Sequence, residues 1–227
     1  MPNLLHRWRE LLRDRGYRIS LLAGLAVLTA SYFLNYYANL YTASAAVLSV
    51  GDLILDHLPT INLSMFYILG IYFTELVFFI YIVFFKPELA PITAKTIGAF
   101  YIIRSFFISL THLGPPANFF NLPQLTDQWG LGRYFYLNDL FFSGHTGFPY
   151  LGALLFWENK TLRWFLLGMS FAQAITVLLM HVHYSIDVFS AYFITYSIYV
   201  VSDKIFNKLT LSFRGIVQKL EKKLDPP

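Results

Sequence analysis

Long apolar runs alternate with short polar segments along this chain. Since about 20 consecutive apolar residues cross the hydrocarbon core of a bilayer, the runs predict six membrane-spanning helices. Their expected limits are about 19–40, 61–85, 94–113, 140–157, 162–181 and 184–203. We therefore expect an all-α, polytopic membrane protein built as a six-helix transmembrane bundle.

Both flanks of the chain alternate apolar and basic residues at helical spacing. The flanks read "LLHRWRELLRDRGYR" and "KLTLSFRGIVQKLEKKL". Such segments form helices that lie on an anionic cytoplasmic leaflet, and ordinary positive flanks of membrane spans are the alternative. The expected organisation is an amphipathic cytoplasmic segment at 1–18, a transmembrane domain at 19–203 and a basic amphipathic tail at 204–227.

Composition agrees with a membrane protein. Of 227 residues, 56% are hydrophobic and 13% are charged, whereas about 25% of residues are charged in soluble domains. The absence of Cys excludes disulfides and thiolate chemistry. No basic, apolar and small-residue cleavage pattern opens the sequence, so we expect no removed signal peptide.

Charged residues divide between the two sides of the expected bundle. Basic residues precede the first span, follow the last, and occupy the 86–95 and 158–163 connections, so the positive-inside rule predicts that both termini are cytoplasmic. The pI near 9.2 reflects this topology, and nucleic acid is excluded because no aromatic stacking platform accompanies the basic residues. The opposite loops, about 41–60 and 114–139, carry Arg133 and the acids Asp52, Asp56, Asp127 and Asp139.

A carboxylate and an imidazole lie four residues apart in "LLMHVHYSIDVFSAYFITYSIYV". On a helix, His183 and Asp187 would share one face, and the carboxylate would fix the tautomer of the ring and prepare it as a nucleophile or a base. A buried structural pair is the alternative. Burial of such a pair in a membrane costs several kcal/mol, which favours a functional role.

A second polar group, "FSGHTG", opens the fourth apolar run. Ser143 and Gly144 precede an expected helix start, where free backbone N–H groups and the helix dipole favour an anion. His145 would lie beside that anion. The alternative is a simple helix N-cap next to a polar ring. Together with His183 and Asp187 on the same membrane side, the pattern favours phosphoryl transfer by two histidines.

Arg104 lies inside an apolar span in "YIIRSFFISLTHLGPP". A permanent cation there requires an anionic partner. The candidates are Asp52, Asp56, Glu75, Asp187 and a bound phosphate. A structural ion pair with Glu75 across two helices is one alternative, and bidentate binding of phosphate oxygens by the guanidinium is the other.

These motifs resemble those of a known family. Two segments read "LFFSGHTGFPYLGALLFWENK" and "HVHYSIDVFSAYFITYSI". They are similar to the third and fourth motifs of the sphingomyelin synthase family, which belongs to the wider type 2 phosphatidic acid phosphatase superfamily. The family's Arg-containing motif resembles "IIRSFFISLTHLGPP", and its acidic first motif resembles "GDLILDHLPTIN". The resemblance covers roughly residues 50–203 and is strongest over 138–203.

The resemblance implies a His, His, Asp triad at the outer or lumenal end of the bundle. His183 is implied as the nucleophile toward a lipid headgroup phosphorus, with Asp187 orienting it and His145 acting as acid and then base. The implied phosphate-binding groups are Arg104, Ser143 and the backbone of Gly144. The chemistry requires no metal and no cofactor. Supporting roles are expected of four further residues, Asp139, His181, Asp52 and Asp56.

The chain also departs from the family pattern. Val177 stands where the broader phosphatases have an Arg, no Arg-Pro motif precedes "SGH", and Val182 stands where many synthases have an acid. The first two absences favour the synthase-like branch, but headgroup and acceptor preferences do not transfer. Because His181 is two residues from His183, it would lie near the opposite helical face, so we expect a supporting or structural role for it.

Three functions remain open from the sequence. The first is a phosphotransferase that moves a phospho-headgroup from a glycerophospholipid to a lipid alcohol such as ceramide, releasing diacylglycerol. The second is a lipid phosphate phosphatase or phospholipase C-like hydrolase that uses water. The third, from another class, is a proton-coupled transporter, whose expected inverted repeat we do not find.

The expected partners are lipid substrates and the bilayer. The substrates would be a glycerophospholipid together with ceramide or diacylglycerol, and the oligomeric state is not predicted. Compact loops favour a bacterial inner-membrane protein, with the active site on the periplasmic or lumenal side.

Overall fold

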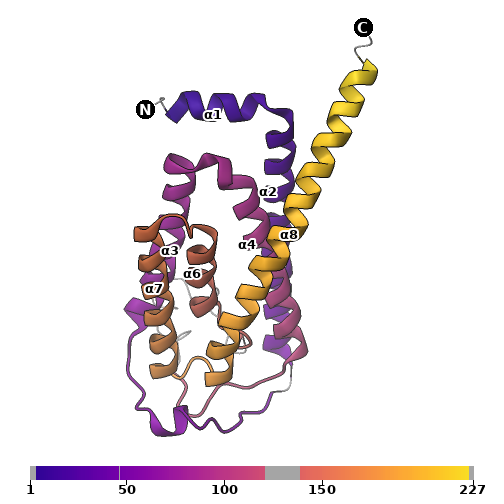
Figure 1. Ribbon diagram of the computed structural model, residues 1–227. Helices are drawn as coiled ribbons and strands as arrows, with labels where there is room; N and C mark the ends of the chain where they lie inside the picture. Colours follow the sequence, from indigo (N-terminus) through magenta and orange to yellow (C-terminus); the bar gives the residue numbers. More distant parts are fainter. Residues whose placement is uncertain (1–3, 46, 121–138, 225–227) are drawn as a thin grey trace.

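The computed structural model describes residues 4–45, 47–120 and 139–224, with side chains described as far as residue 206. Its helices run side by side as a bundle with α1 lying across one end (Figure 1). They are α1 (Leu4–Arg13), α2 (Arg15–Ser44), α3 (Ser64–Ile80), α4 (Ala90–Leu110), α6 (Gly144–Leu155), α7 (Lys160–Leu179) and α8 (Ser185–Leu224), with short turns η1 (Leu55–His57), η2 (Tyr81–Phe85) and η3 (Pro87–Leu89). The described residues are thus helical, apart from connections and one isolated bridge between Leu48 and Leu113.

Each of the six predicted apolar runs contains a helix, and four helical stretches are long and apolar enough to cross a membrane. These stretches are Arg15–Ser44, Ser64–Phe85, Lys160–Leu179 and Ser185–Phe206. Helix α6 has 12 residues and therefore measures about 18 Å, which is shorter than a hydrocarbon core of about 30 Å. The protein is a helical membrane protein with at least these four candidate spans, and the full set of six remains a prediction.

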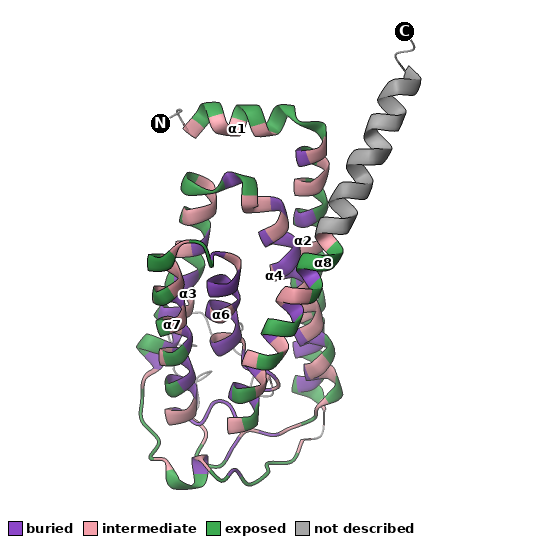
Figure 2. Cartoon of the chain, in the orientation of Figure 1, coloured by how far each residue is buried: buried purple, intermediate pink, exposed green. Residues whose placement is uncertain are grey.

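Helix α6 lies in the middle of the bundle, where it is the most completely buried helix in view (Figure 2). Its aromatic ring Phe148 packs on Phe78 of α3 with ring centroids 4.8 Å apart and on Phe100 of α4 at 6.3 Å. At Gly152 the ring of Phe78 fills the space that a Cβ atom would need. A short, tightly enclosed helix thus carries the "SGH" motif, and its burial limits how far that motif can move.

The N-terminal segment contains two helices joined at Asp14. The Asp14 side chain accepts a hydrogen bond from the backbone N–H of Tyr17 and so caps α2. Helix α1 is held across the end of the bundle by a bond from the Trp8 indole to the Val83 carbonyl (3.0 Å) and by the Arg7–Glu88 ion pair (2.9 Å). Residues 4–18 therefore pack on the protein as well as carrying an amphipathic pattern.

The predicted C-terminal tail begins inside α8, which continues without a break to Leu224. Its side chains beyond residue 206, and with them the amphipathic pattern of 204–227, lie outside the described residues. The same holds for residues 121–138 of the predicted outer loop, including Asp127 and Arg133.

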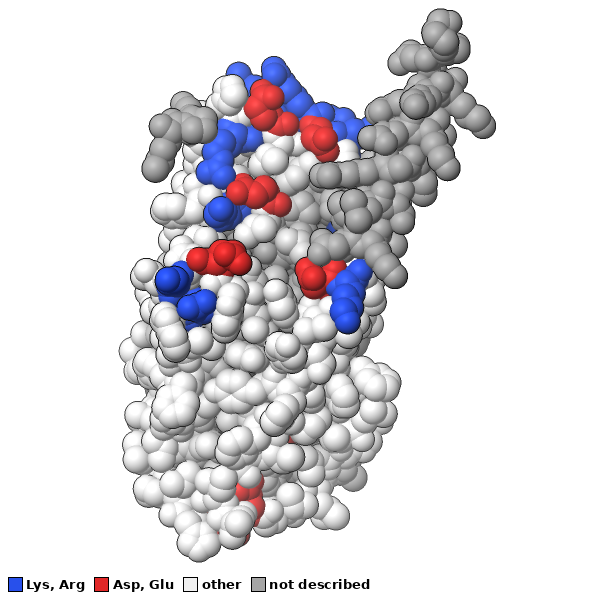
Figure 3. Space-filling model, viewed as in Figure 1, with Lys and Arg blue, Asp and Glu red and all other residues white. Residues whose placement is uncertain are grey.

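Charge is unevenly distributed along the bundle. In the face shown in Figure 3, basic and acidic side chains gather at the end that carries α1, whereas the opposite end shows acidic atoms without basic ones. The positive-inside rule relates this asymmetry to the two sides of a membrane. The cytoplasmic location of both termini remains a prediction.

Candidate active site

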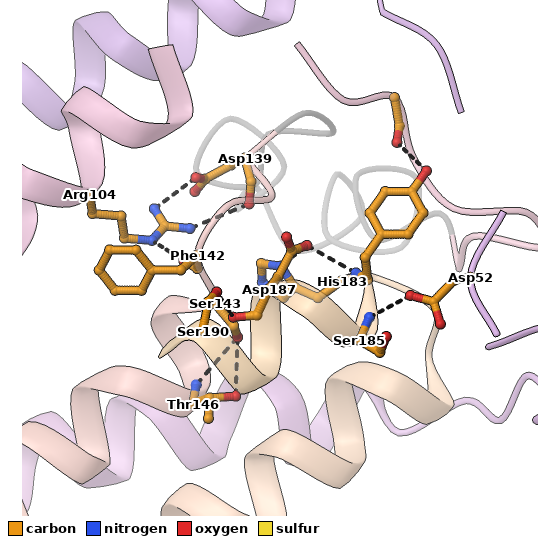
Figure 4. A network of polar contacts seen from close by, with 12 residues as sticks. Asp52, Arg104, Asp139, Phe142, Ser143, Thr146, His183, Ser185, Asp187 and Ser190 are labelled. Atoms are coloured by element: carbon orange, nitrogen blue, oxygen red, sulfur yellow. Dashed lines mark hydrogen bonds and ion pairs between the residues drawn. The ribbon is translucent and has the colours of Figure 1, made fainter. Parts of the chain in front are cut away.

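Two helix starts at the acidic end of the bundle bring the candidate residues together: the start of α8, next to His183, and the start of α6, next to His145. Figure 4 shows the polar network that joins them.

The segment from His181 to Tyr184 connects α7 to α8, close to the expected break between the 162–181 and 184–203 runs. Helix α7 ends because His181 has a φ of 52°, which is the left-handed conformation of a helix C-terminus. The N–H groups of His181 and Val182 bond back to the carbonyls of Leu178 (3.0 Å) and Val177 (3.1 Å). This Schellman motif turns the chain before α8 begins.

His183 and Asp187 approach through a helix cap. Asp187 is the third residue of α8, and its Oδ2 accepts a hydrogen bond from the backbone N–H of Tyr184 (2.9 Å), as acids at this position commonly do. The same Oδ2 lies 3.4 Å from His183 Nδ1. Both side chains are buried, and Asp187 Oδ1 has no hydrogen-bond partner among the described residues. The carboxylate therefore has a single described ring to orient, that of His183.

Asp52 closes the start of α8 from a distant part of the sequence. Its Oδ2 accepts from the N–H of Ser185 at 2.6 Å, and its Oδ1 accepts from Ile54 (2.9 Å) and Leu55 (3.1 Å). Burial raises the pKa of this carboxyl, but the hydrogen bonds from Ser185, Leu55 and Ile54 outweigh burial and hold the pKa below its ordinary value. Asp52 thus positions the helix that carries Asp187.

The start of α6 is capped by Ser143, as the predicted helix start requires. Ser143 Oγ accepts from the N–H of Thr146 (3.4 Å) and from its hydroxyl (3.2 Å). The Ser143 backbone N–H donates to the carbonyl of Asp187 at 3.0 Å. The Ser143 side chain is therefore a helix N-cap, as the alternative predicts. The backbone bond to Asp187 joins "FSGHTG" to the segment that carries His183 and Asp187.

His145 lies between α3 and the His183 pair. Its ring stacks on Tyr67 with centroids 3.8 Å apart and planes at 21°. The ring is close enough to His183 and Arg104 for electrostatic interaction. Its Nε2 is buried without a hydrogen-bond partner among the described residues, so a polar group of a ligand would satisfy it.

Arg104 binds the segment that leads into "SGH". It forms an ion pair with Asp139 at 2.7 Å and donates to the carbonyls of Phe142 (2.9 Å) and Asp139 (3.3 Å). A Cβ atom on Gly144 would lie 3.2 Å from Arg104 Nε, so glycine admits the guanidinium to the helix start. The alternative of an ion pair with Glu75 is wrong: among the described residues Arg104 pairs with Asp139, which was not among its predicted partners.

Asp56 and His181 line a separate cavity of about 170 Å³ beside the start of α8. His181 Nδ1 lies 2.9 Å from the carbonyl of Ala117, while the Asp56 side chain is exposed. The opposite-face argument for His181 fails because the residue lies in the turn after α7. A supporting role for it stays a prediction.

Two tyrosines belong to this region and were missed from the sequence. Tyr67 stacks on His145, and Tyr184 donates from its hydroxyl to the Gly114 carbonyl (2.9 Å) while accepting from the Val50 N–H (3.1 Å). The chain holds 16 tyrosines, and no local spacing distinguishes these two. Across the described residues, no group of three or more His, Cys, Asp or Glu side chains is arranged to hold a metal ion.

A family model matches the part of the chain that contains α6, α7 and the first part of α8. Residues 138–204 match the model described as PAP2 superfamily C-terminal. The matched range contains Ser143, His145, His183 and Asp187. It supports a relation of this chain to the PAP2 superfamily, whose members are generally phosphatases and phosphotransferases. No curated protein and no solved structure matches the chain. The sphingomyelin synthase-like branch stays a prediction.

Proposed function

We propose that the protein is a membrane phosphotransferase that moves a phospho-headgroup from a glycerophospholipid to a lipid alcohol such as ceramide. The observation that carries the proposal is a buried His183–Asp187 contact of 3.4 Å together with the buried, unpartnered Nε2 of His145. His145 lies two residues after Ser143, whose backbone N–H donates to the Asp187 carbonyl at 3.0 Å. The PAP2 superfamily match supports lipid phosphatase or phosphotransferase chemistry in general.

In the first step, His183 acts as the nucleophile. The Asp187 carboxylate accepts the Nδ1 proton of His183 in a hydrogen bond, so Nε2 carries the lone pair that attacks the headgroup phosphorus. The bond between phosphorus and the diacylglycerol oxygen breaks, and His145 gives that oxygen a proton. Diacylglycerol leaves, and the headgroup phosphate is held on His183, whose positive charge Asp187 stabilises.

In the second step, the proton returns. His145, now neutral, removes the hydroxyl proton of the lipid alcohol, whose oxygen attacks the phosphorus. The bond between phosphorus and His183 Nε2 breaks, and the headgroup is transferred to the alcohol. General acid and base catalysis of this kind contributes about 10²- to 10⁴-fold to a rate.

Phosphate oxygens are bound at the start of α6. The first N–H groups of the helix and its dipole favour an anion, and Arg104 adds a positive charge next to Gly144. The three nitrogen atoms of Arg104 already contact Asp139 and Phe142. Arg104 therefore acts on the phosphate through its charge and through the loop that it holds, in addition to any direct contact.

The burial of His183 and Asp187 favours a lipid alcohol over water as the acceptor, because a site closed to bulk solvent limits competing hydrolysis. Hydrolysis by the same residues is the second candidate, and the superfamily match favours it equally. The two candidates share every step up to the choice of acceptor.

Acceptor dependence tests the proposal. Purified protein is incubated with labelled phosphatidylcholine, phosphatidylethanolamine, phosphatidylinositol or phosphatidic acid, with and without ceramide. Transfer releases diacylglycerol only when ceramide is present, together with the matching headgroup-labelled ceramide. Release of free phosphate or of a free phospho-headgroup without ceramide identifies a hydrolase instead.

Histidine variants test the mechanism in the same assay. His183→Ala and His145→Ala each lower turnover by at least a hundredfold, as expected when a nucleophile or a general acid is removed. His112→Ala is the matched control, because this exposed histidine lies at the same end and contacts the Tyr41 ring. Full turnover in both His183→Ala and His145→Ala would refute the mechanism.

A further inference from the structure

We propose that the cavity beside the start of α8 binds the primary ammonium group of an ethanolamine headgroup, with Asp56 and His181 as its acceptors. The inference rests on the proposed function, because it assigns the headgroup that the site takes. The cavity would be a headgroup subsite near the catalytic pair, and the preferred glycerophospholipid would carry ethanolamine.

The cavity is lined by residues that neighbour His183 in the sequence. It has a volume of about 170 Å³. His181 and Tyr184 line it, and His183 lies between them in the sequence. The chain on both sides of His183 therefore borders the cavity. Ethanolamine places its nitrogen only two carbon atoms from the phosphate ester oxygen.

The charge of the cavity favours a cation. Asp56 and Asp52 are the acids among the described lining residues, and no Lys or Arg is among them. The Asp52 carboxylate is already bonded to three backbone N–H groups. The Asp56 carboxylate, by contrast, makes no hydrogen bond or ion pair with the described residues. An uncompensated carboxylate at the rim attracts a positive group.

His181, a lining residue of the cavity, supplies a second acceptor in its wall. Its Nδ1 lies 2.9 Å from the Ala117 carbonyl, and because a carbonyl can only accept, Nδ1 carries the proton and Nε2 carries a lone pair. That Nε2 is buried and has no hydrogen-bond partner among the described residues, in a side chain that is 2% exposed. A buried unpartnered acceptor costs free energy unless a ligand donates to it.

The lining chemistry distinguishes two kinds of ammonium. A quaternary ammonium has no N–H donor and is recognised by aromatic cages. The described lining residues include one Tyr and neither Phe nor Trp, and the Tyr184 hydroxyl is bonded to Gly114. A primary ammonium has three N–H donors, which match the Asp56 carboxylate and His181 Nε2. The cavity therefore favours ethanolamine over choline.

The test compares headgroups within one assay. The ratio of kcat/KM for phosphatidylethanolamine to kcat/KM for phosphatidic acid is measured in the wild type, Asp56→Asn and His181→Asn. Asparagine is used at position 181 because it tolerates the left-handed backbone there. The ratio falls about tenfold in each variant, and Asp56→Glu, which keeps the charge, restores part of it.

A charge-matched variant at the other end of the molecule serves as control. Glu10→Gln also removes one negative charge, from the exposed face of α1, and it leaves the ratio at the wild-type value. An unchanged ratio in both cavity variants would overturn the subsite. So would a wild type that cleaves phosphatidylcholine at least as well as phosphatidylethanolamine.

Direct binding separates this inference from the proposed function. Calorimetry with phosphoethanolamine, phosphocholine and calcium chloride is performed on the detergent-solubilised full chain. Tighter binding of phosphoethanolamine than phosphocholine, weakened in Asp56→Asn, supports the subsite even if the wild type releases no diacylglycerol from any lipid. Calcium binding that requires Asp56 and that phosphoethanolamine does not displace would instead assign the cavity to a divalent cation.

Discussion

The starts of α6 and α8 lie close together at one end of the bundle, yet their electrostatics are opposite. At α8, two carboxylates cover the backbone: Asp52 accepts from Ser185 and Asp187 accepts from Tyr184. At α6, the cap is the neutral side chain of Ser143, and the guanidinium of Arg104 lies against Gly144. One helix start is thus filled by negative charge, and the other keeps its positive character.

This difference matches the two needs of phosphoryl transfer. A histidine nucleophile benefits from a carboxylate that orients it and stabilises its cation, which the α8 start supplies to His183. The phosphate oxygens benefit from backbone N–H groups and a cation, which the α6 start supplies beside His145. The bond from Ser143 to the Asp187 carbonyl (3.0 Å) joins the two starts.

Removing the charge at the α8 start has the largest expected effect on catalysis. Asp187→Asn keeps the shape of the side chain but loses the carboxylate beside His183, so the ring loses its preferred tautomer. Turnover in the lipid assay falls about a thousandfold, within the range of acid and base contributions. Folding, followed by circular dichroism, stays cooperative. Turnover within threefold of the wild type would exclude a catalytic role for the pair.

Arg104→Lys tests the α6 start next. Lysine keeps the positive charge but cannot reproduce the fork that contacts Asp139 and Phe142 at once. Turnover falls about a hundredfold and the apparent midpoint of thermal unfolding decreases, because lysine loses part of the set of charge-assisted hydrogen bonds, each of which contributes about 1.5–3 kcal/mol. Glu75→Gln, which removes one of the candidate acids for Arg104, leaves the Arg104–Asp139 contact intact and serves as the comparison.

Gly144→Ala is expected to have a smaller effect at the same place. The added Cβ lies 3.2 Å from Arg104 Nε, so the guanidinium must shift by a few tenths of an ångström. Turnover falls about tenfold while stability changes by less than about 1 kcal/mol, since alanine also favours helix over glycine. A crystal or cryo-electron microscopy structure of the variant showing Arg104 unmoved, with turnover reduced, would contradict this cause.

Asp52→Asn has the smallest expected effect, and this effect is on the free energy of unfolding. An amide cannot accept all three backbone bonds, so the free energy of unfolding falls by about 1 kcal/mol, as for other helix caps. Because hydrogen bonds lower the pKa of Asp52 below its ordinary value of 3.8, its stabilising contribution is present above pH 3.8 and is lost as pH falls through the lower folded pKa.

Thermal unfolding of the wild type and Asp52→Asn at pH 7, pH 4 and pH 3 measures that dependence. The difference between the two proteins is largest at pH 7, is smaller at pH 4 and narrows further at pH 3. A difference that grows as pH falls would mean that the Asp52 pKa is raised rather than lowered.

Local features of this chain were predictable because they depend on neighbours in sequence. Apolar runs located the helices, and Ser143 before Gly144 predicted where α6 begins. The limit of such reasoning is visible at His181, whose positive φ ends α7 and so removes the helical geometry that placed His181 and His183 on opposite faces. The periodicity of apolar residues does not predict a left-handed helix C-terminus at a residue other than glycine or asparagine.

The sequence by itself determined the helical membrane architecture, the uneven charge of the two ends and the residue types of a two-histidine site. Tertiary structure alone decided that Arg104 pairs with Asp139, that Asp52 caps a helix 133 residues away and that His181 lines a cavity with Asp56. The physical reason is that hydrophobic runs and caps act over a few residues. Ion pairs and cavities, in contrast, depend on which distant elements the packing of the bundle brings into contact.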